Sequence, residues 1–315
     1  MTNVEAIEKA IDTTILADGG KLQPEQAKKF IDFMVDESVL LKEIQFRRMK
    51  APEAKLDFLN ISRRIVRAAA EGTTPGELAT ISTAERSLKV TEVILPIEIT
   101  YSFLEENIEG PGVEDKIVRM FAKQFVNDLE DLAINGDTQA QNADSTQPHY
   151  YNLDNSQIAF LKILDGWLQL ILADPDKHVV DAAGKSWQEV FKEALASLPR
   201  RFKVNRKDLR FYVAPNVEEE YRYSLVARQT ELGDKFLTSD KTATFMGIPV
   251  VPVPHMPDNY VLLTNPKNLA FGIMRDITIE KDKDILRRVK QYVITAKVGV
   301  QIVTADAAVL AYPMS

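Results

Sequence analysis

The sequence predicts an α+β fold that combines a long hairpin, one long amphipathic helix and an α/β unit. Three observations lead to this prediction. Alternation with a period of two appears within residues 44–100 and again near the end of the chain, residues 112–135 repeat their apolar positions every three to four residues, and strands alternate with helices in between. The 315 residues, 45% of them hydrophobic, suffice for one large or two modest globular units.

Residues 1–43 are predicted to form an N-terminal arm rather than a domain. A short first helix has its apolar residues on one face and ends at Gly19 and Gly20. A second helix begins near Pro24, because proline is tolerated in the first turn of a helix.

Residues 44–100 are expected to form an extended β-hairpin. Its tip is Glu71-Gly-Thr-Thr-Pro-Gly76, where Gly72 and Gly76 allow the hairpin to flex. Its return limb is clearest where apolar residues alternate, and Pro96 within that limb favours an edge strand or a bulge. The alternating residues are Val93, Leu95, Ile97 and Ile99. We expect so long a limb to bury its apolar face against another subunit.

The hairpin region is basic, whereas the remainder of the chain is acidic. The segment 42–67 has eight basic and three acidic residues, so its net charge is +5 and that of the remainder is −12. Such complementarity steers docking between copies, and Arg63, Arg64 and Arg67 are the predicted contacts between protomers. A solvated charged ribbon explains the same charges equally well.

Residues 112–135 carry the strongest helix pattern in the chain. Four apolar residues on one face are the predicted core of this helix: Ile117, Phe121, Phe125 and Leu129. Charged residues fill the opposite face, and the helix would be about 35 Å long. Asn135-Gly-Asp137 predicts its C-cap and a polar loop that continues to about residue 155.

Residues 157–269 are predicted to form the α/β unit around a mixed sheet. Its helices are expected at 158–172, 187–198 and 217–227, a short strand and turn at 178–184, and further strands at 209–214, 248–253 and 261–263. Residues 270–303 are expected to be long strands, because the even positions from 294 to 302 are apolar. Residues 304–315 would then return to the α/β unit.

No catalytic, cofactor or metal site is predicted. The chain has no cysteine, and its three histidines, His149, His178 and His255, are far apart in sequence and lack metal-ligand spacing. Asp174-Pro-Asp176 and Asp282-Lys-Asp284 are more typical of turns than of cation sites. Glu105 and Glu106 are adjacent carboxylates that face different ways.

Charge and hydropathy narrow the possible partners. The net charge of −7 argues against tight capture of nucleic acid, so DNA is expected to be a non-specific neighbour. The N-terminus lacks the features of a signal peptide, and no apolar run is long enough to cross a bilayer, so no membrane partner is expected.

The order of these parts resembles the major capsid protein of tailed bacteriophages. The acid-rich helix 113–137 ending in Asn-Gly-Asp is similar to the spine helix of that family. Phe245-Met-Gly-Ile-Pro-Val-Val-Pro-Val-Pro254, followed by segments 263–272 and 275–280, is similar to the strand and loop of its axial domain. The resemblance implies the tailed-phage capsid fold, with N-terminal arm, extended loop, peripheral domain (101–156 and 270–303), spine helix and axial domain (157–269, with 304–315 returning to it).

The resemblance also implies a structural protein, not an enzyme, that assembles with itself as pentamers and hexamers into the icosahedral head enclosing double-stranded DNA. The expected partners are a separate scaffolding protein, since the arm begins almost at Met1, a portal and a decoration protein. Assembly would take place in the bacterial cytoplasm and the product would reside in the virion. Some relatives form a lysine–asparagine isopeptide bond, but no matching pair is predicted here.

Two alternatives remain open from the sequence. An encapsulin-like nanocompartment shares the fold but encloses a cargo enzyme, and the long basic hairpin favours the phage. A soluble α/β enzyme would require a convergent pocket and would form a small, fixed oligomer.

Overall fold

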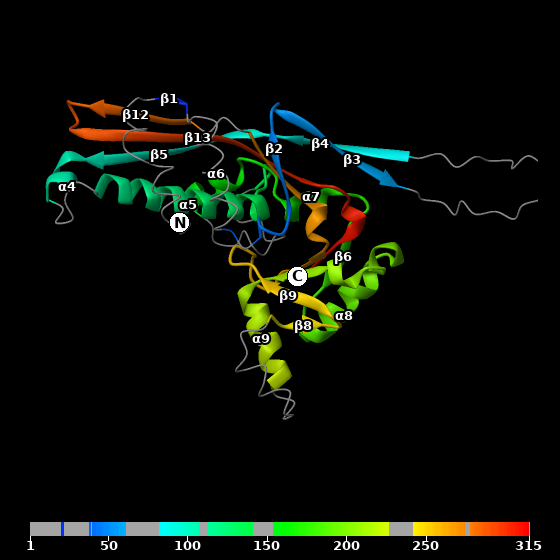
Figure 1. Cartoon of the computed structure of the whole chain (residues 1–315). Helices are drawn as coiled ribbons and strands as arrows, with labels where there is room; N and C mark the ends of the chain where they lie inside the picture. The colour runs from blue at the N-terminus through cyan, green and yellow to red at the C-terminus, as the bar shows by residue number, and fades with distance from the viewer. Residues whose placement is uncertain are drawn as a thin grey trace, which may run out of the picture.

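The computed structural model of the chain describes residues 20–21, 38, 40–60, 82–106, 113–140, 154–226, 242–274 and 278–314. The expected helices of the arm, the tip of the hairpin and most of the polar loop lie outside these residues. Figure 1 shows a long sheet with a helix along it, a second sheet below, and a hairpin that projects to one side.

The long sheet is built around one strand, β13 (Val289–Ile302). One edge of β13 pairs with β5 (Thr91–Thr100). Its other edge pairs first with β12 (Thr278–Asp284) and then with β11 (Leu269–Met274). Two further strands complete the sheet, β1 (Gly20–Lys21) beside β12 and β2 (Gln45–Met49) parallel to β11.

The sequence prediction of a long, half-buried terminal strand is confirmed in β13. Its even positions, Ile294, Ala296, Val298, Val300 and Ile302, are buried. Most odd positions between them are only partly buried, as the period of two in an extended strand requires.

The expected return limb of the hairpin is wrong. Residues 82–89 form β4 and pair with β3 (Glu53–Asn60), while residues 93–99 lie in β5 and pair with β13. The hairpin therefore spans residues 53–89, fewer than the predicted 44–100. Val93, Ile97 and Ile99 are buried within their own chain, because β5 supplies a half-buried edge of the long sheet rather than a free limb. Pro96 is exposed opposite Val293, and among the described residues β5 pairs with β13 alone, so the predicted edge position is confirmed.

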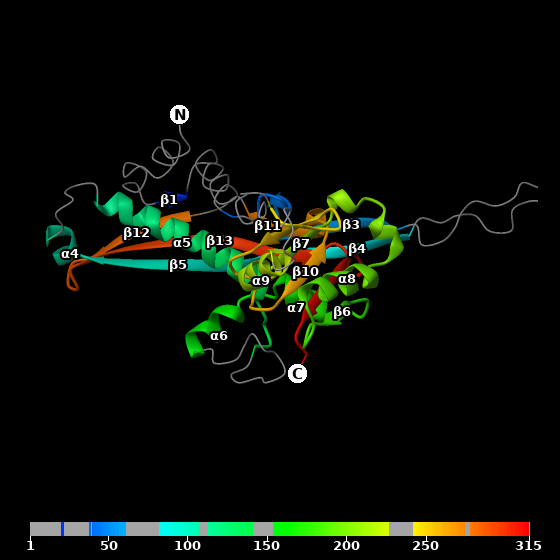
Figure 2. The same ribbon diagram turned by 90° about the horizontal axis from the view of Figure 1, so that it is seen from below.

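Helix α5 (Val113–Asn135) lies along the long sheet and follows the short helix α4 (Tyr101–Glu106) (Figures 1 and 2). It begins within one residue of the predicted start. It ends at Asn135, the predicted last residue, and Gly136 N–H donates to Leu132 O at 3.0 Å. Gly136 is needed for close approach, because a Cβ there would lie 2.2 Å from the Leu164 carbonyl oxygen.

The second sheet is mixed, as the sequence predicted. Its order is β6 (His178–Asp181), β14 (Ala308–Tyr312), β10 (Val261–Thr264), β7 (Arg210–Val213), β9 (Ile248–Pro252) and β8 (Thr244–Phe245). The β6–β14 and β7–β9 pairs are parallel and the others antiparallel. Strand β14 brings the C-terminal segment into this sheet.

Two helices pack against the mixed sheet, α8 (Trp187–Ser197) and α9 (Pro215–Val226). Ser186 starts α8 with a capping box shared with Glu189. The single helix expected at 158–172 is two helices, α6 (Asn155–Leu161) and α7 (Trp167–Ala173). Gly166 is the N-cap of α7, and its N–H donates to Gly136 O at 2.8 Å. The chain between α6 and α7 therefore packs against the end of α5.

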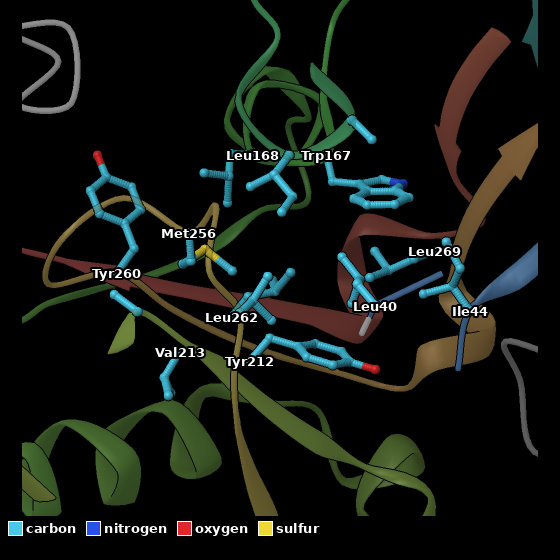
Figure 3. Close-up of a cluster of buried hydrophobic side chains, with 14 of the residues drawn as sticks. Leu40, Ile44, Trp167, Leu168, Tyr212, Val213, Met256, Tyr260, Leu262 and Leu269 are labelled. Atoms are coloured by element: carbon cyan, nitrogen blue, oxygen red, sulfur yellow. The ribbon is translucent and has the colours of Figure 1, made fainter. Parts of the chain in front are cut away.

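The two sheets share one hydrophobic core. Figure 3 shows its corner, where Leu40 and Ile44 lie near Trp167, Tyr212 and Leu269. Leu40 is 2% exposed. Residues 40–44, which precede β2, thus anchor the end of the predicted arm in the main hydrophobic core.

Candidate assembly surfaces

The hairpin of β3 and β4 is the first candidate surface. Its strands pair from Glu53–Lys89 to Asn60–Ser82 and extend away from both sheets (Figures 1 and 2). The predicted contact residues Arg63, Arg64 and Arg67 and the glycines Gly72 and Gly76 lie outside the described residues.

The base of the hairpin is packed onto the long sheet by a small hydrophobic cluster. Its buried members are Met49, Leu56, Leu88 and Ala270. Two glycines in the long sheet make this approach possible. A Cβ on Gly272 would lie 2.6 Å from Met49 Sδ, and one on Gly299 would lie 2.1 Å from the Lys89 carbonyl oxygen. The body of the protomer therefore fixes where the hairpin leaves the sheet.

Polar contacts add to this attachment. Arg86 on β4 pairs with Asp174 at the end of α7. Gln301 Nε2 donates to the Ser87 carbonyl oxygen at 2.9 Å. Since both contacts link β4 to other elements, they orient the hairpin relative to the body.

The predicted core face of α5 is only partly buried. Phe125 is 4% exposed and Leu129 is also buried, and both belong to the main core. Phe121 is 37% exposed, so the prediction that it belongs to the core is wrong. The reason is that it lines a surface groove near the end of β5. The side chain of Ile117 lies outside the described part of the structure.

This groove is the second candidate surface. It has a volume of about 600 Å³ and is lined by Glu98, Ile99, Thr100, Phe103, Met120, Phe121 and Gln124. Met120 is 72% exposed. At the same end of the sheet, the turn between β12 and β13 presents Leu286, which is 97% exposed. Large exposed apolar side chains of this kind mark interaction sites.

The two histidines that the structure describes make contacts within the protomer. His178 Nε2 lies 2.8 Å from Asp306 Oδ1, and the His255 carbonyl oxygen accepts a bond from Asn135. His149 lies outside the described residues. Within the part of the chain that the structure describes, no group of three or more potential ligands could hold a metal ion.

Asp174-Pro-Asp176 forms a turn after α7, whereas Asp282-Lys-Asp284 is the end of strand β12. Asp174 Oδ1 accepts the Asp176 N–H at 3.0 Å, and Asp282 Oδ1 accepts the Lys283 N–H at 2.7 Å. Asp284 Oδ1 accepts the N–H groups of residues 286 and 287.

No helix among the described residues is both long and apolar enough to cross a membrane.

The fold is that of a capsid shell subunit. The chain superposes on a chain of the satellite phage P4 procapsid with a TM-score of 0.69 at 15% identity, over 91% of this chain and 90% of that chain. A chain of the capsid of an empty GTA particle gives 0.59 at 14% identity, over 89% and 90%. No family model matches the sequence.

A curated relative identifies the family. The protein named "Putative prophage capsid protein YqbE" from Bacillus subtilis (strain 168) is 33% identical in an alignment over 313 residues, and the match covers 94% of this chain and 94% of that one. The chain belongs to this family of prophage capsid proteins.

The predicted capsid fold and capsid function are thus confirmed. The encapsulin alternative has the same fold but less support, because a chain of the SrpI encapsulin from Synechococcus elongatus PCC 7942 gives a TM-score of 0.53 at 8% identity, over 87% of this chain and 86% of that chain. Membership of this family implies a structural role for the chain.

The sequence alone did not reveal the apolar groove. Its lining residues come from β5, α4 and α5, and only the fold brings them together. No pattern within one element marks it, because consecutive apolar residues such as Phe125 and Val126 are both buried on the same helix.

Proposed function

We propose that the chain assembles as pentamers and hexamers into the icosahedral head of a tailed phage and encloses double-stranded DNA. The observation that carries this proposal is the hairpin of β3 and β4. Its base is fixed by buried contacts, whereas its strands extend beyond the body of the protomer (Figure 1). A rigidly attached, outward-reaching element of this kind suits contacts with a neighbouring copy, and heterologous contacts of this kind close into rings.

Each part of the chain has a role in this proposal. The axial domain (157–269 with 304–315) packs around the local five- and six-fold axes. The hairpin lies over the adjacent protomer, where Arg63, Arg64 and Arg67 contact its acidic surface. Gly72 and Gly76 allow the hairpin to adjust between the two kinds of ring. Many weak interfaces then hold the closed shell through multivalency.

The proposal includes partners outside the shell lattice. A separate scaffolding protein guides assembly in the bacterial cytoplasm, a portal occupies one vertex, and a decoration protein binds the finished capsid. The chain itself performs no catalysis. DNA is a sequence-independent neighbour inside the virion.

Negative-stain electron microscopy with sedimentation velocity on the full chain tests the assembly. Closed shells, tubes or rings of capsomers are expected. A stable monomer or dimer, even with candidate scaffolding proteins added, would contradict the proposal.

The role of the hairpin needs a separate variant, in which Arg63, Arg64 and Arg67 are all replaced by Glu. We expect a folded protein with an unchanged circular dichroism spectrum that no longer forms shells. The matched control replaces Lys162, Lys177 and Lys192 by Glu, since these are exposed residues on another part of the surface. Normal shells from the arginine variant would rule out the proposed contacts.

A further inference from the structure

A basic segment lies outside the hairpin region that the sequence analysis singled out. Residues 200–210 contain six basic residues and one acid, Asp208, in a chain whose net charge is −7. The six are Arg200, Arg201, Lys203, Arg206, Lys207 and Arg210. We name residues 200–208 the basic platform.

The basic platform is an ordered structure between α8 and β7. Two short 3₁₀ helices, Arg200–Lys203 and Arg206–Asp208, form it. Leu198 and Leu209 flank it, and both are buried. Backbone hydrogen bonds fix the turns, including Phe202 N–H to Pro199 O at 3.0 Å and Leu209 N–H to Arg206 O at 3.2 Å. The cationic side chains therefore project from a fixed backbone.

Some cations of this segment are already used within the protomer. Arg201 pairs with Asp306, and Arg210 Nε lies 3.6 Å from Glu43 Oε2. Lys203 Nζ donates to the Ala196 carbonyl oxygen at 2.9 Å.

Three cations of the basic platform remain available. Arg200, Arg206 and Lys207 are exposed, and they form no ion pair with any residue that the structure describes. A local surplus of positive charge on an acidic molecule creates a confined region of positive potential.

The shape of the basic platform also suits an anion. A concavity of about 510 Å³ is lined by Lys203, Val204, Asn205, Arg206, Lys207 and Asp208. Val204, 80% exposed, is the only large apolar side chain in this lining. Interfaces between proteins have an apolar core, whereas interfaces with DNA are more polar and much more positively charged. The composition of the platform favours nucleic acid.

We propose that the basic platform contacts the phosphodiester backbone of the enclosed DNA, independently of its sequence. This inference rests on the proposed function, since it requires a shell that encloses DNA, and it assigns the platform to the inner face of that shell. Each copy contributes few phosphate contacts, so a single chain binds weakly. Because the platform is repeated over the whole shell, the combined attraction for DNA is substantial. The acidic remainder of each chain repels DNA, so the DNA can still be released.

The binding test uses the full chain before assembly and a short fluorescein-labelled DNA duplex. The platform variant carries Arg200→Gln, Arg206→Gln and Lys207→Gln. The control variant carries Lys162→Gln, Lys177→Gln and Lys192→Gln, which remove the same charge elsewhere on the surface. Fluorescence anisotropy is measured between about 50 and 200 mM salt.

We expect the platform variant to bind at least about tenfold more weakly at low salt, with a salt slope smaller by about 0.9 for each lost phosphate contact. The control variant should match the unmodified chain. Binding by the platform variant within about twofold of the unmodified chain, or an equal loss in the control variant, would overturn the inference.

Assembly of the same variants separates this inference from the proposed function. Shells that form normally from the platform variant support a DNA contact. Loss of shells with unchanged DNA binding would show instead that the platform contacts an acidic surface of a second copy. Failure of the unmodified chain to form shells would contradict the proposed function, and the anisotropy comparison would still decide whether the platform binds DNA.

The position of the platform can be tested directly, because the chain has no cysteine. Val204→Cys places a single thiol on the platform. A bulky maleimide should label it in unassembled chains but not in closed shells. Rapid labelling of intact shells would place the platform outside and overturn the inference.

Discussion

The hydroxyl group of Tyr212 donates a hydrogen bond of 3.0 Å to Oε2 of Glu43. Glu43 lies two residues before β2 of the long sheet, whereas Tyr212 lies in β7 of the mixed sheet. The bond therefore links the segment before β2, at one edge of the long sheet, to an inner strand of the second sheet. Burial, together with the neighbouring Glu43 carboxylate, raises the pKa of Tyr212, so its hydroxyl group remains a donor at any working pH.

Removal of this donor should weaken the fold modestly. Tyr212→Phe keeps the buried ring but deletes the hydroxyl group, and we expect a loss of about 0.5–1.5 kcal/mol in the free energy of unfolding. Tyr223→Phe is the control, since Tyr223 is exposed on α9. Denaturant unfolding of the two variants measures the difference. Equal stability of both would show that the Glu43 bond contributes nothing.

Two phenylalanines one turn apart on α5 should differ in their importance. Phe125→Ala should lower the free energy of unfolding by about 3–5 kcal/mol, because it empties a buried site. Phe121→Ala should lower it by less than about 1 kcal/mol, since its partly exposed ring lines the apolar groove. If the groove is an interface, Phe121→Ala should instead reduce the yield of shells. Similar destabilisation by both substitutions would place Phe121 in the core after all.

Periodicity predicted individual elements better than their partners. The alternation of Ile294 and the even positions after it identified β13, because a buried face imposes a period of two. The same alternation at 93–99 was assigned to the hairpin, although β5 pairs with a strand almost two hundred residues later. Local sequence does not encode which distant strand completes a sheet, so this pairing required the fold.

Glycines illustrate a second limit of the sequence. Asn135-Gly-Asp137 predicted a helix cap, yet Gly136 serves the close approach of α5 to the segment before α7. The glycine itself is visible in the sequence. The backbone of Leu164, which leaves no room for a side chain at Gly136, is 28 residues away and is brought there only by the fold. The same holds for Gly272 and Gly299 at the base of the hairpin.

Gly136→Ala should therefore be strongly destabilising. Its new Cβ would meet the carbonyl oxygens of Leu164 and Leu132, at 2.2 and 2.7 Å. Backbone atoms cannot turn aside as a flexible side chain can, so we expect a loss of at least about 3 kcal/mol or failure to fold. Gly184→Ala is the comparison, since nothing lies within 4 Å and only its positive φ of +67° opposes a side chain. That substitution should lose about 1 kcal/mol. Thermal unfolding that ranks the two in the opposite order would refute the close-approach argument.

Asp306 should make the stability depend on pH in the acid range. Burial raises the pKa of its carboxyl group, but hydrogen bonds from His178 and Arg201 outweigh this effect and hold the pKa below the ordinary value of 3.8. Its contribution is therefore fully present above about pH 4 and is lost as the pH falls through the folded-state value. Asp306→Asn should flatten the loss of stability below about pH 4. An unchanged pH profile in this variant would show that the cluster does not stabilise the fold.

The last prediction concerns the ion pair of Arg86 and Asp174, which links β4 to the end of α7. The apolar base of the hairpin does not depend on this pair, so Arg86→Glu should leave the protein folded. Repulsion between the introduced carboxylate and Asp174 should nevertheless change the angle at which the hairpin leaves the body. Since a neighbouring copy would receive the hairpin at a fixed angle, we expect fewer closed shells and more irregular assemblies. Combining Arg86→Glu with Asp174→Arg restores opposite charges and should recover part of the shell yield, measured by electron microscopy. A double variant no better than Arg86→Glu would indicate that the pair has no role in orienting the hairpin, because only an orienting role predicts rescue by reversed charges.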